Sequence, residues 1–428
     1  MFKEKVFWHD TVQMPSGQET NPLPEQVDVA VIGSGYTGLT AALTLAKLGV
    51  RVAVLESETI GWGASSRNGG MVLTGLKISM QAAIKRYGQD FARRLFQCSL
   101  DSINTVETIC REEKIQCGFA RSGHLLVANK PKHYDLLAKE VDFMAKEFNH
   151  AVRLIPRSEQ RAEIGSDLYY GALVDEVSAG LNPAQYVTGL ANAAEKAGAT
   201  LHARARVNSL EHGKKRFSLE MERGTLTAEK VFVATNGYID SVTPALRRKI
   251  MPIGSFIIAT EPLSDELAHE LSPQNRMIFD FKHFLNYFRP SEDQRMIFGG
   301  RAAFFPENER TIRQSAGILK REMVTVYPQL RDVEIEYAWG GTLGFAFDLM
   351  PHVGELDGMF YALGFAGHGV ALGTHLGKTV AEEMLRGNIK EHPFTGFPFP
   401  GAPLGLYRER AWFLPFVGAW HRFLDLIE

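Results

Sequence analysis

Val27-Asp28-Val29-Ala30-Val31-Ile32 runs directly into Gly33-Ser34-Gly35-Tyr36-Thr37-Gly38, and this stretch decides the fold. The apolar, β-branched run is typical of a buried parallel strand. In the glycine pattern, Gly33 permits a tight turn, Gly35 lets the backbone approach a pyrophosphate, and Gly38 lets a helix pack on the strand. The apolar run 39–48 predicts that helix, and Gly49 ends it.

A second strand over 51–55 ends in Glu56, about 20 residues beyond the glycines, where a carboxylate accepts hydrogen bonds from ribose hydroxyls. The helix N-terminus then faces the phosphates with free N–H groups and the positive end of its dipole. A glycine pattern alone is a weak signal, and an ordinary βαβ turn without a ligand is the alternative. Strand, helix, second strand and acid occur here in register, so the sequence predicts an adenine dinucleotide site.

Composition limits the class of protein. The 428 residues suffice for two domains, and 45% apolar with 22% charged residues is ordinary for a globular protein. Lys plus Arg number 47 against 49 for Asp plus Glu, which gives no reason to expect nucleic acid as a partner. Cys98, Cys110 and Cys117 lack metal-ligand spacing, and their odd number argues against a disulfide framework. With no signal-peptide pattern and no run of membrane-spanning length, we expect a cytoplasmic protein without a metal site.

Further along the chain, periodicity predicts helices over 78–114, 134–148, 183–198, 311–327 and 370–386. Short strands separated by turns over 251–298 indicate an antiparallel sheet, the floor of a second domain. The glycine-rich segment Gly364-Phe365-Ala366-Gly367-His368-Gly369 stands before the last of these helices. A second helix N-terminus is therefore expected near the ligand of the first motif.

Several motifs together match one family. They are Gly33–Gly38 with Glu56, Gly63-Ala64-Ser65-Ser66-Arg67-Asn68-Gly69-Gly70, Val233-Ala234-Thr235-Asn236-Gly237, and Gly364–Gly369. In these segments the chain resembles the FAD-dependent amine and amino-acid oxidoreductases related to D-amino-acid oxidase, glycine oxidase and monomeric sarcosine oxidase. Within that family it most resembles the γ-glutamylputrescine oxidoreductase branch.

The resemblance implies an α/β fold with a Rossmann-like FAD-binding domain of the GR2 type and an interleaved α+β substrate domain built on an antiparallel sheet. The expected FAD-binding domain comprises 27–79, 151–245 and 335–390. The substrate domain comprises 80–150 and 246–334. Residues 1–26 form an N-terminal arm, and 391–428 form a C-terminal extension with an amphipathic helix.

The resemblance also implies the cofactor contacts. Ser65 and Ser66 would touch the phosphates or the flavin edge, Met71 would run along the ring, and Val207 would contact the adenine through its backbone. The 370–386 helix would point its N-terminus at the flavin N1–C2=O edge, where reduced flavin carries negative charge. The full expected set is Gly33, Ser34, Gly35, Tyr36, Thr37, Gly38, Glu56, Ser57, Ala64, Ser65, Ser66, Arg67, Asn68, Gly69, Gly70, Met71, Val207, Ala234, Thr235, Gly364, Phe365, Gly367, His368, Gly369 and Val370.

Two departures from the family pattern matter. Monomeric sarcosine oxidases tether their flavin through a cysteine late in the chain, but here no cysteine follows Cys117, so FAD is expected to be non-covalent. Those enzymes also hold the substrate carboxylate with a lysine just after the glycine-histidine-glycine turn. Here that place reads Val370-Ala371-Leu372, which favours a longer amine whose reacting end has no adjacent carboxylate.

Candidate catalytic residues are His352 and His368, expected near the flavin ring, and Tyr287 and Arg289, expected on a sheet strand that faces it. For the histidines the alternative is a hydrogen-bonded structural role, and for Tyr287 and Arg289 it is an ordinary sheet edge. Arg67 is expected to position its loop.

The expected reaction is oxidation of the C–N bond of an amine, with hydride transfer to flavin, hydrolysis of the imine to an aldehyde, and reoxidation by O2 or another acceptor. One alternative is a membrane-associated flavin dehydrogenase of glycine, sarcosine or D-amino acids that passes electrons to quinone. It depends on the amphipathic segment Trp412–Ile427, for which packing on the protein's own surface or on a second subunit is the favoured explanation. A nicotinamide-dependent dehydrogenase leaves Ser65–Gly70 and Gly364–Gly369 unexplained, and a non-catalytic flavoprotein has no feature in its favour.

Overall fold

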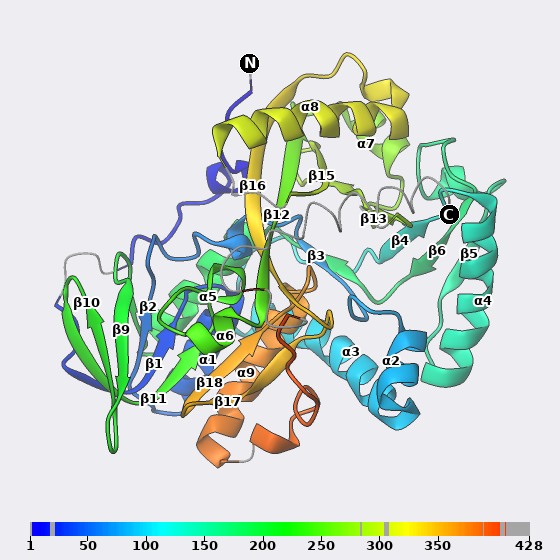
Figure 1. Cartoon of the computed structure of the whole chain (residues 1–428). Coiled ribbons are helices and arrows are strands. Elements are labelled where there is room, and N and C mark those ends of the chain that lie inside the picture. The colour runs from blue at the N-terminus through cyan, green and yellow to red at the C-terminus, as the bar shows by residue number, and fades with distance from the viewer. Residues whose placement is uncertain are drawn as a thin grey trace.

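Two eight-stranded sheets organise the molecule (Figure 1). The computed structural model describes residues 2–17, 22–282, 285–303, 308–387, 389–402 and Tyr407. The expected C-terminal amphipathic helix lies outside these residues. Of the residues described, no helix is both long and apolar enough to cross a membrane.

The first sheet has the doubly wound order that the N-terminal motif predicts. Six of its strands run in the order β17 (His352–Leu356), β18 (Met359–Leu363), β11 (Gly224–Val233), β1 (Gln26–Ile32), β2 (Val52–Leu55) and β8 (Thr200–His202). The other two, β10 (Phe217–Met221) and β9 (Val207–His212), continue from β11 in an antiparallel arrangement. β18, β11, β1, β2 and β8 are parallel, and β1 lies at the centre. Ile32 is in register with both Leu55 and Val233, so three strands end together at the switch point where such sheets bind ligands.

Successive side chains of β1 point to opposite faces of the first sheet and enter two different hydrophobic cores. Val29 and Val31 are buried in the core formed with four helices, α1 (Tyr36–Lys47), α3 (Gln89–Glu112), α5 (Pro183–Lys196) and α9 (Ala371–Arg386). Ala30, between them, faces a different core that includes β9 and β10. The sheet is therefore covered on both faces, as its nearly continuous apolar strands require.

The second sheet is mostly antiparallel and carries the other domain. Its order is β16 (Ile335–Ala346), β12 (Ile250–Thr260), β15 (Met296–Ala303), β14 (Tyr287–Pro290), β13 (Met277–Asp280), β4 (His124–Val127), β6 (Gly171–Asp175) and β5 (Arg153–Pro156). Ile278, Phe288 and Phe298 pack with α8 (Glu309–Val326) in one core, and α8 crosses above the sheet in Figure 1. The alternate residues of these strands point the other way, toward the first domain.

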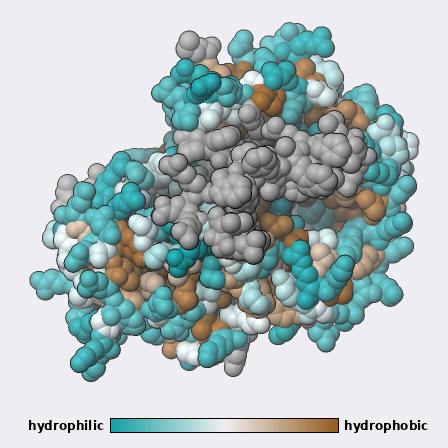
Figure 2. All heavy atoms as spheres, in the orientation of Figure 1, coloured by the Kyte–Doolittle hydropathy of each residue, from teal (hydrophilic) through white to brown (hydrophobic). Residues whose placement is uncertain are grey.

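The remaining elements connect these layers. They are α2 (Met80–Tyr87), α4 (Pro131–Phe148), α6 (Pro244–Arg247), α7 (Asp265–Leu271) and the short pair β3 (Met71–Val72) and β7 (Ala179–Gly180). Most outward side chains on the face in Figure 2 are hydrophilic. Among the described residues, the exposed large hydrophobic side chains are Leu48, Leu136, Leu168 and Leu385.

The predicted domain boundaries need correction at three places. β5 and β6 pair in the second sheet, although 151–245 was expected in the FAD-binding domain. β16 also pairs there with β12, although 335–390 was expected in the FAD-binding domain. Conversely, α3 packs in the core of the first sheet through residues such as Ile103 and Val106. Helix periodicity gave the existence of α3 but carried no information about which sheet its apolar face would meet.

The N-terminal arm is more ordered than expected. Phe7–Asp10 form a short 3-10 helix in which Phe7 and Trp8 are buried. These side chains join a core with Tyr337 and Trp339 of β16. The arm is thereby fixed against the second sheet.

Candidate active site

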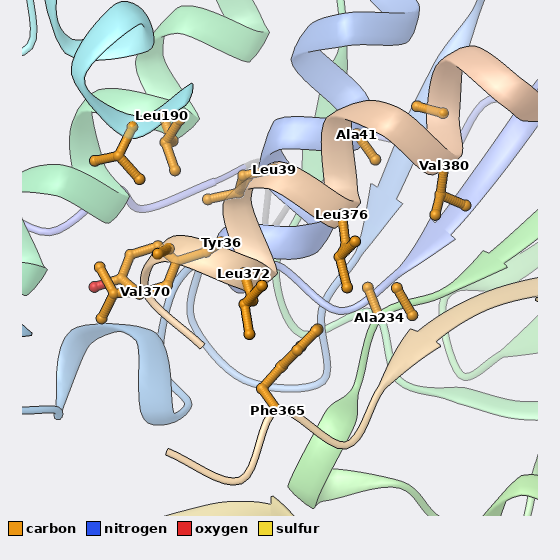
Figure 3. Packing of buried hydrophobic residues seen from close by; sticks show 14 of the residues in the cluster. Tyr36, Leu39, Ala41, Leu190, Ala234, Phe365, Val370, Leu372, Leu376 and Val380 are labelled. Atoms are coloured by element: carbon orange, nitrogen blue, oxygen red, sulfur yellow. The ribbon is translucent and has the colours of Figure 1, made fainter. Parts of the chain in front are cut away.

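One cavity lies where the first sheet ends, and the early and late glycine turns both line it. The space is about 1290 Å³, part of it open to solvent. Gly33–Thr37 line it from the start of α1, and Phe365, Gly367, Gly369 and Val370 line it from the turn before α9. Figure 3 shows Tyr36, Phe365 and Val370 around the start of α9. Two helix N-termini therefore meet at one cavity, which favours an anionic ligand.

Close packing of α1 on α9 sets this arrangement. A Cβ atom on Gly377 would stand 2.3 Å from the carbonyl oxygen of Thr37, and one on Gly373 would stand 3.0 Å from the Thr37 hydroxyl. At the strand end, Gly33 has a φ of +103°, which a side chain would strain, and a Cβ atom on Gly38 would stand 1.9 Å from the Gly33 carbonyl oxygen. Glycine at these positions allows the close approach that the sequence pattern predicts.

Gly35 makes room for Ser65. A Cβ atom on Gly35 would stand 2.9 Å from the Ser65 hydroxyl oxygen, which accepts a 3.0 Å hydrogen bond from the Tyr36 N–H. The second glycine of the motif thus allows the Gly63–Gly70 loop to reach the start of α1.

Glu56 lines the cavity with its carboxylate held in place. The backbone N–H and the hydroxyl of Ser34 donate to Oε2 at 2.9 and 2.6 Å, and the N–H of Glu58 donates to Oε1 at 3.0 Å. An acceptor fixed at the end of β2 suits the ribose hydroxyls of an adenosine.

The late turn is held by Asn236. Its side-chain oxygen accepts a 2.9 Å hydrogen bond from the Gly364 N–H, and the Gly344 carbonyl accepts one from the Ala366 N–H at 3.0 Å. Asn236 itself has a φ of 44°, a conformation that asparagine tolerates better than most residues. The turn after β11 therefore fixes the turn after β18.

Two tryptophans anchor the loop between Gly63 and Gly70. The indole N–H of Trp339 donates to the Arg67 carbonyl at 2.8 Å, and that of Trp8 donates to the Asn68 carbonyl at 2.9 Å. The Arg67 guanidinium lies 4.3 Å from the ring centroid of Trp62 and donates to the Trp62 carbonyl. These contacts suit a loop-positioning role for Arg67.

Arg289 does not extend into open space. Its Nε donates to the Gly69 carbonyl at 2.8 Å, and its Nη2 donates to the Leu181 carbonyl at 2.5 Å. Burial lowers the pKa of this guanidinium to about 10. These contacts give Arg289 a positioning role for the glycine loop, and its expected catalytic role stays a prediction.

Tyr287 and His368 lie at the edges of the site. The Tyr287 ring contacts Gly69, and its hydroxyl lies 3.2 Å from Ser255 Oγ. Burial raises the Tyr287 pKa to about 12. Burial, followed by the charge of Lys77, lowers the pKa of His368 to about 4, so the imidazole is neutral at pH 7.

His352 lies outside the cavity wall, and its expected place near the flavin ring stays a prediction. It begins β17, with Nε2 3.0 Å from Asp348 Oδ1 and its ring stacked on Phe399 at a centroid distance of 4.0 Å. The ion-pair geometry with Asp348 and the stacking on Phe399 fit the alternative, a hydrogen-bonded structural histidine.

The cavity wall contains most of the expected cofactor residues. The others are not part of the wall. Those on the wall are Gly33, Ser34, Gly35, Tyr36, Thr37, Glu56, Ser57, Ala64, Ser65, Asn68, Val207, Ala234, Thr235, Phe365, Gly367, Gly369 and Val370. Those not on it are Gly38, Ser66, Arg67, Gly69, Gly70, Met71, Gly364 and His368. Their contacts with a cofactor remain predictions.

The wall also includes residues outside the expected cofactor set, among them Trp62, Asn236, Tyr238, Thr342 and Leu343. The Tyr238 hydroxyl accepts a 3.1 Å hydrogen bond from the Thr342 N–H, so β16 closes this side of the cavity. Asn236 belongs to the family motif Val233–Gly237 and Tyr238 follows it directly, which was a usable signal. No sequence signal pointed to Thr342 and Leu343, because strand β16 was not predicted.

The residues present fit FAD. The site offers a glycine turn and helix N-terminus for a pyrophosphate, a fixed acid for a ribose, and a second helix N-terminus. Thr235 lines the cavity, and its buried hydroxyl has no hydrogen-bond partner among the described residues. A buried polar atom without a partner at a cavity wall is explained by a ligand that supplies one.

Comparison with known proteins identifies the family. The family model described as FAD dependent oxidoreductase, DAO, matches residues 28–383. Gamma-glutamylputrescine oxidoreductase of Escherichia coli is 33% identical over 380 residues, covering 87% of this chain and 88% of that protein. The probable oxidoreductase OrdL of Haemophilus influenzae is 33% identical over 382 residues, covering 88% of this chain and 87% of that protein.

Solved structures share the fold. Glycine oxidase from Geobacillus kaustophilus superposes with a TM-score of 0.73 at 22% identity, covering 90% of this chain and 99% of the other. L-proline dehydrogenase from P. horikoshii gives a TM-score of 0.71 at 21% identity, covering 87% and 98%. The predicted fold class, a Rossmann-like flavin domain with an interleaved second domain, is confirmed.

Proposed function

The chain belongs to the DAO family of FAD-dependent oxidoreductases, and from this premise we propose that it oxidises the C–N bond of an elongated amine resembling γ-glutamylputrescine. The observation that carries the proposal is the shared cavity, where the early and late glycine turns meet. The name of the 33% identical Escherichia coli relative supports the substrate class.

FAD, when bound, supplies the hydride acceptor. The protein positions the amine and keeps water from the reacting carbon. Loss of a hydride and a proton from the H–C–N–H unit leaves an imine. Once released from the site, the imine is hydrolysed by water to an aldehyde and ammonia or a smaller amine. His368, neutral at pH 7, adds no positive charge beside the amine. O2 is the proposed final acceptor, and its two-electron reduction gives H2O2.

The sequence around the late turn also supports an elongated substrate. Val370-Ala371-Leu372 occupies the place of a carboxylate-binding lysine in monomeric sarcosine oxidases. Val370, Ala371 and Leu372 are buried and apolar. Such a position cannot pair with the carboxylate of a small amino acid.

The test is anaerobic reduction of the purified holoprotein. γ-Glutamylputrescine should bleach the flavin absorbance near 450 nm, and admitted air should restore it with formation of H2O2. Bleaching only by glycine, sarcosine or D-amino acids would overturn the proposed substrate class. Bleaching that persists in air would overturn only the choice of O2 as acceptor.

A further inference from the structure

Lys77 stands on the loop between β3 and α2 without a counter-ion. Among the described residues, no hydrogen bond or salt bridge engages its ammonium group. Surrounding protein lowers its pKa through desolvation, and no carboxylate opposes this effect. The side chain nevertheless keeps part of its surface accessible, as expected if it faces an internal space. A desolvated charge is costly without a partner, so this space favours an anion.

The base of this loop is tied to the second sheet. The Thr74 N–H donates to Ser178 Oγ at 3.1 Å, and the same oxygen lies 2.8 Å from Nδ1 of His124 on β4. The Thr74 hydroxyl donates to Asp175 at 2.7 Å. One residue later, a Cβ atom on Gly75 would meet nothing within 4 Å. The loop is thus fixed beside β4 and borders open space.

An apolar row on the sheet adjoins His124. Leu126 is in register with Phe279, and Phe279 is in register with Tyr287. Residues in register share one face of a sheet, and this face is opposite the α8 core. All three side chains are only half-buried, whereas Leu125, Ile278 and Phe288 between them are fully buried. Leu126 packs at the edge of the small core around Leu137 and Leu173, and the row keeps part of its apolar surface accessible as a floor.

This space adjoins the cofactor cavity. Lys77 and His124 both lower the pKa of His368, so each lies within electrostatic reach of His368. His368 is flanked by Gly367 and Gly369, which line the cofactor cavity. Nδ1 of His368 has no hydrogen-bond partner among the described residues. Lys77 and His124 therefore lie beside the late turn, and the His124 ring contacts Phe279 of the apolar row at a centroid distance of 5.1 Å.

We propose that Lys77 binds a carboxylate carried by the amine substrate, while the substrate's methylene chain lies on the floor formed by Leu126, Phe279 and Tyr287. Lys77 is then a specificity-determining residue. It supplies from the 73–79 loop the positive charge that the late turn lacks at Val370-Ala371-Leu372. This inference rests on the proposed function and names the substrate class further, as an amine with an anionic group.

The experiment compares Lys77→Met and Lys77→Arg holoenzymes with wild type on two substrates. γ-Glutamylputrescine carries the carboxylate, and N-acetylputrescine keeps the diamine and the amide without it. Lys77→Met should raise KM for γ-glutamylputrescine at least tenfold, the loss expected for a charge-assisted hydrogen bond. It should leave KM for N-acetylputrescine within twofold, and Lys77→Arg should recover part of the loss. Lys85→Met, which removes an exposed lysine of α2, is the matched control and should change neither value.

Equal effects of Lys77→Met on both substrates, or no effect on either, would overturn the assignment of Lys77. Failure of γ-glutamylputrescine to reduce the wild-type flavin would instead overturn the proposed function. In that case the same variants are compared on the amino acid that does reduce it and on its primary amide. A selective loss for the acid would support Lys77 as the carboxylate site, and a shared loss would contradict it.

Discussion

Gly377 of α9 lies against Thr37 of α1 so closely that a Cβ atom on the glycine would stand 2.3 Å from the threonine carbonyl oxygen. The contact holds the two helix N-termini at one cavity. Gly377→Leu should therefore separate the helices, destabilise the fold by about 1–3 kcal/mol or more, and lower FAD occupancy. Thermal unfolding and the ratio of absorbance at 280 and 450 nm measure both effects.

The matched control is Gly317→Ala on α8, where a Cβ atom would have only the end of the Arg321 side chain near it, at 3.9 Å. That variant should keep its flavin and gain about 0.5–1 kcal/mol, because alanine is the better helix former. Full flavin content in Gly377→Leu would contradict the account of the helix contact.

Trp339→Phe removes one indole N–H from the glycine loop while keeping a ring in the core. The Arg67 carbonyl, in a part-buried contact, then loses its 2.8 Å donor, at a cost of about 1–3 kcal/mol. We expect FAD affinity to fall about five- to a hundredfold, measured by fluorescence titration of the apoprotein. Unchanged affinity would show that Trp339 only fills the core.

Arg289→Met tests whether the arginine positions the loop or touches substrate. The change leaves the Gly69 and Leu181 carbonyls without their donor. The positioning role predicts lower thermal stability and lower flavin content, with KM for the amine nearly unchanged in the fraction that retains FAD. A large rise in KM with normal flavin content and stability would return Arg289 to the substrate site.

Acid should destabilise the fold through buried histidines. Burial lowers the pKa of His392 to about 3 and that of His202 to about 4. Between pH 6.5 and about 4 the unfolded chain therefore binds more protons than the folded chain, and the free energy of unfolding falls as the pH falls. At pH 5.5 each group should cost on the order of 1 kcal/mol.

His392 also fixes a hydrogen-bond pattern, since its Nδ1 accepts from the Phe394 N–H at 3.1 Å. His392→Gln should reduce the loss of stability between pH 7.5 and 5.5, measured by urea unfolding. The exposed His269→Gln is the control and should leave the loss unchanged. Identical pH dependence in His392→Gln and wild type would contradict the assignment.

Local pattern predicted the first domain well because its signals are local. The strand, glycine turn, helix and second strand at 27–56 occupy neighbouring positions, and β1, α1 and β2 follow them closely. The glycine-rich motif at 364–369 likewise predicted the turn before α9. That the two turns share a cavity followed from the resemblance, and the geometry agrees with it.

Other features depended on partners distant in sequence. β16 was not predicted because Gly340, Gly341 and Gly344 lower strand propensity. Gly344 is explained only by Asn236, whose side-chain oxygen would stand 2.3 Å from an added Cβ atom. Arg289 likewise meets its acceptors in segments more than 100 residues away. Asp348 lies four residues before His352 in the sequence. Their hydrogen bond could not be predicted, because it depends on a turn that the sequence pattern did not define.

The most direct test of the central claim is a crystal structure of the holoprotein with FAD. The account predicts the pyrophosphate beside Ser34–Thr37, the adenosine ribose at Glu56, and the flavin ring at the turn formed by Gly367–Val370. Density for FAD in another place, or an isoalloxazine ring far from the late turn, would contradict it.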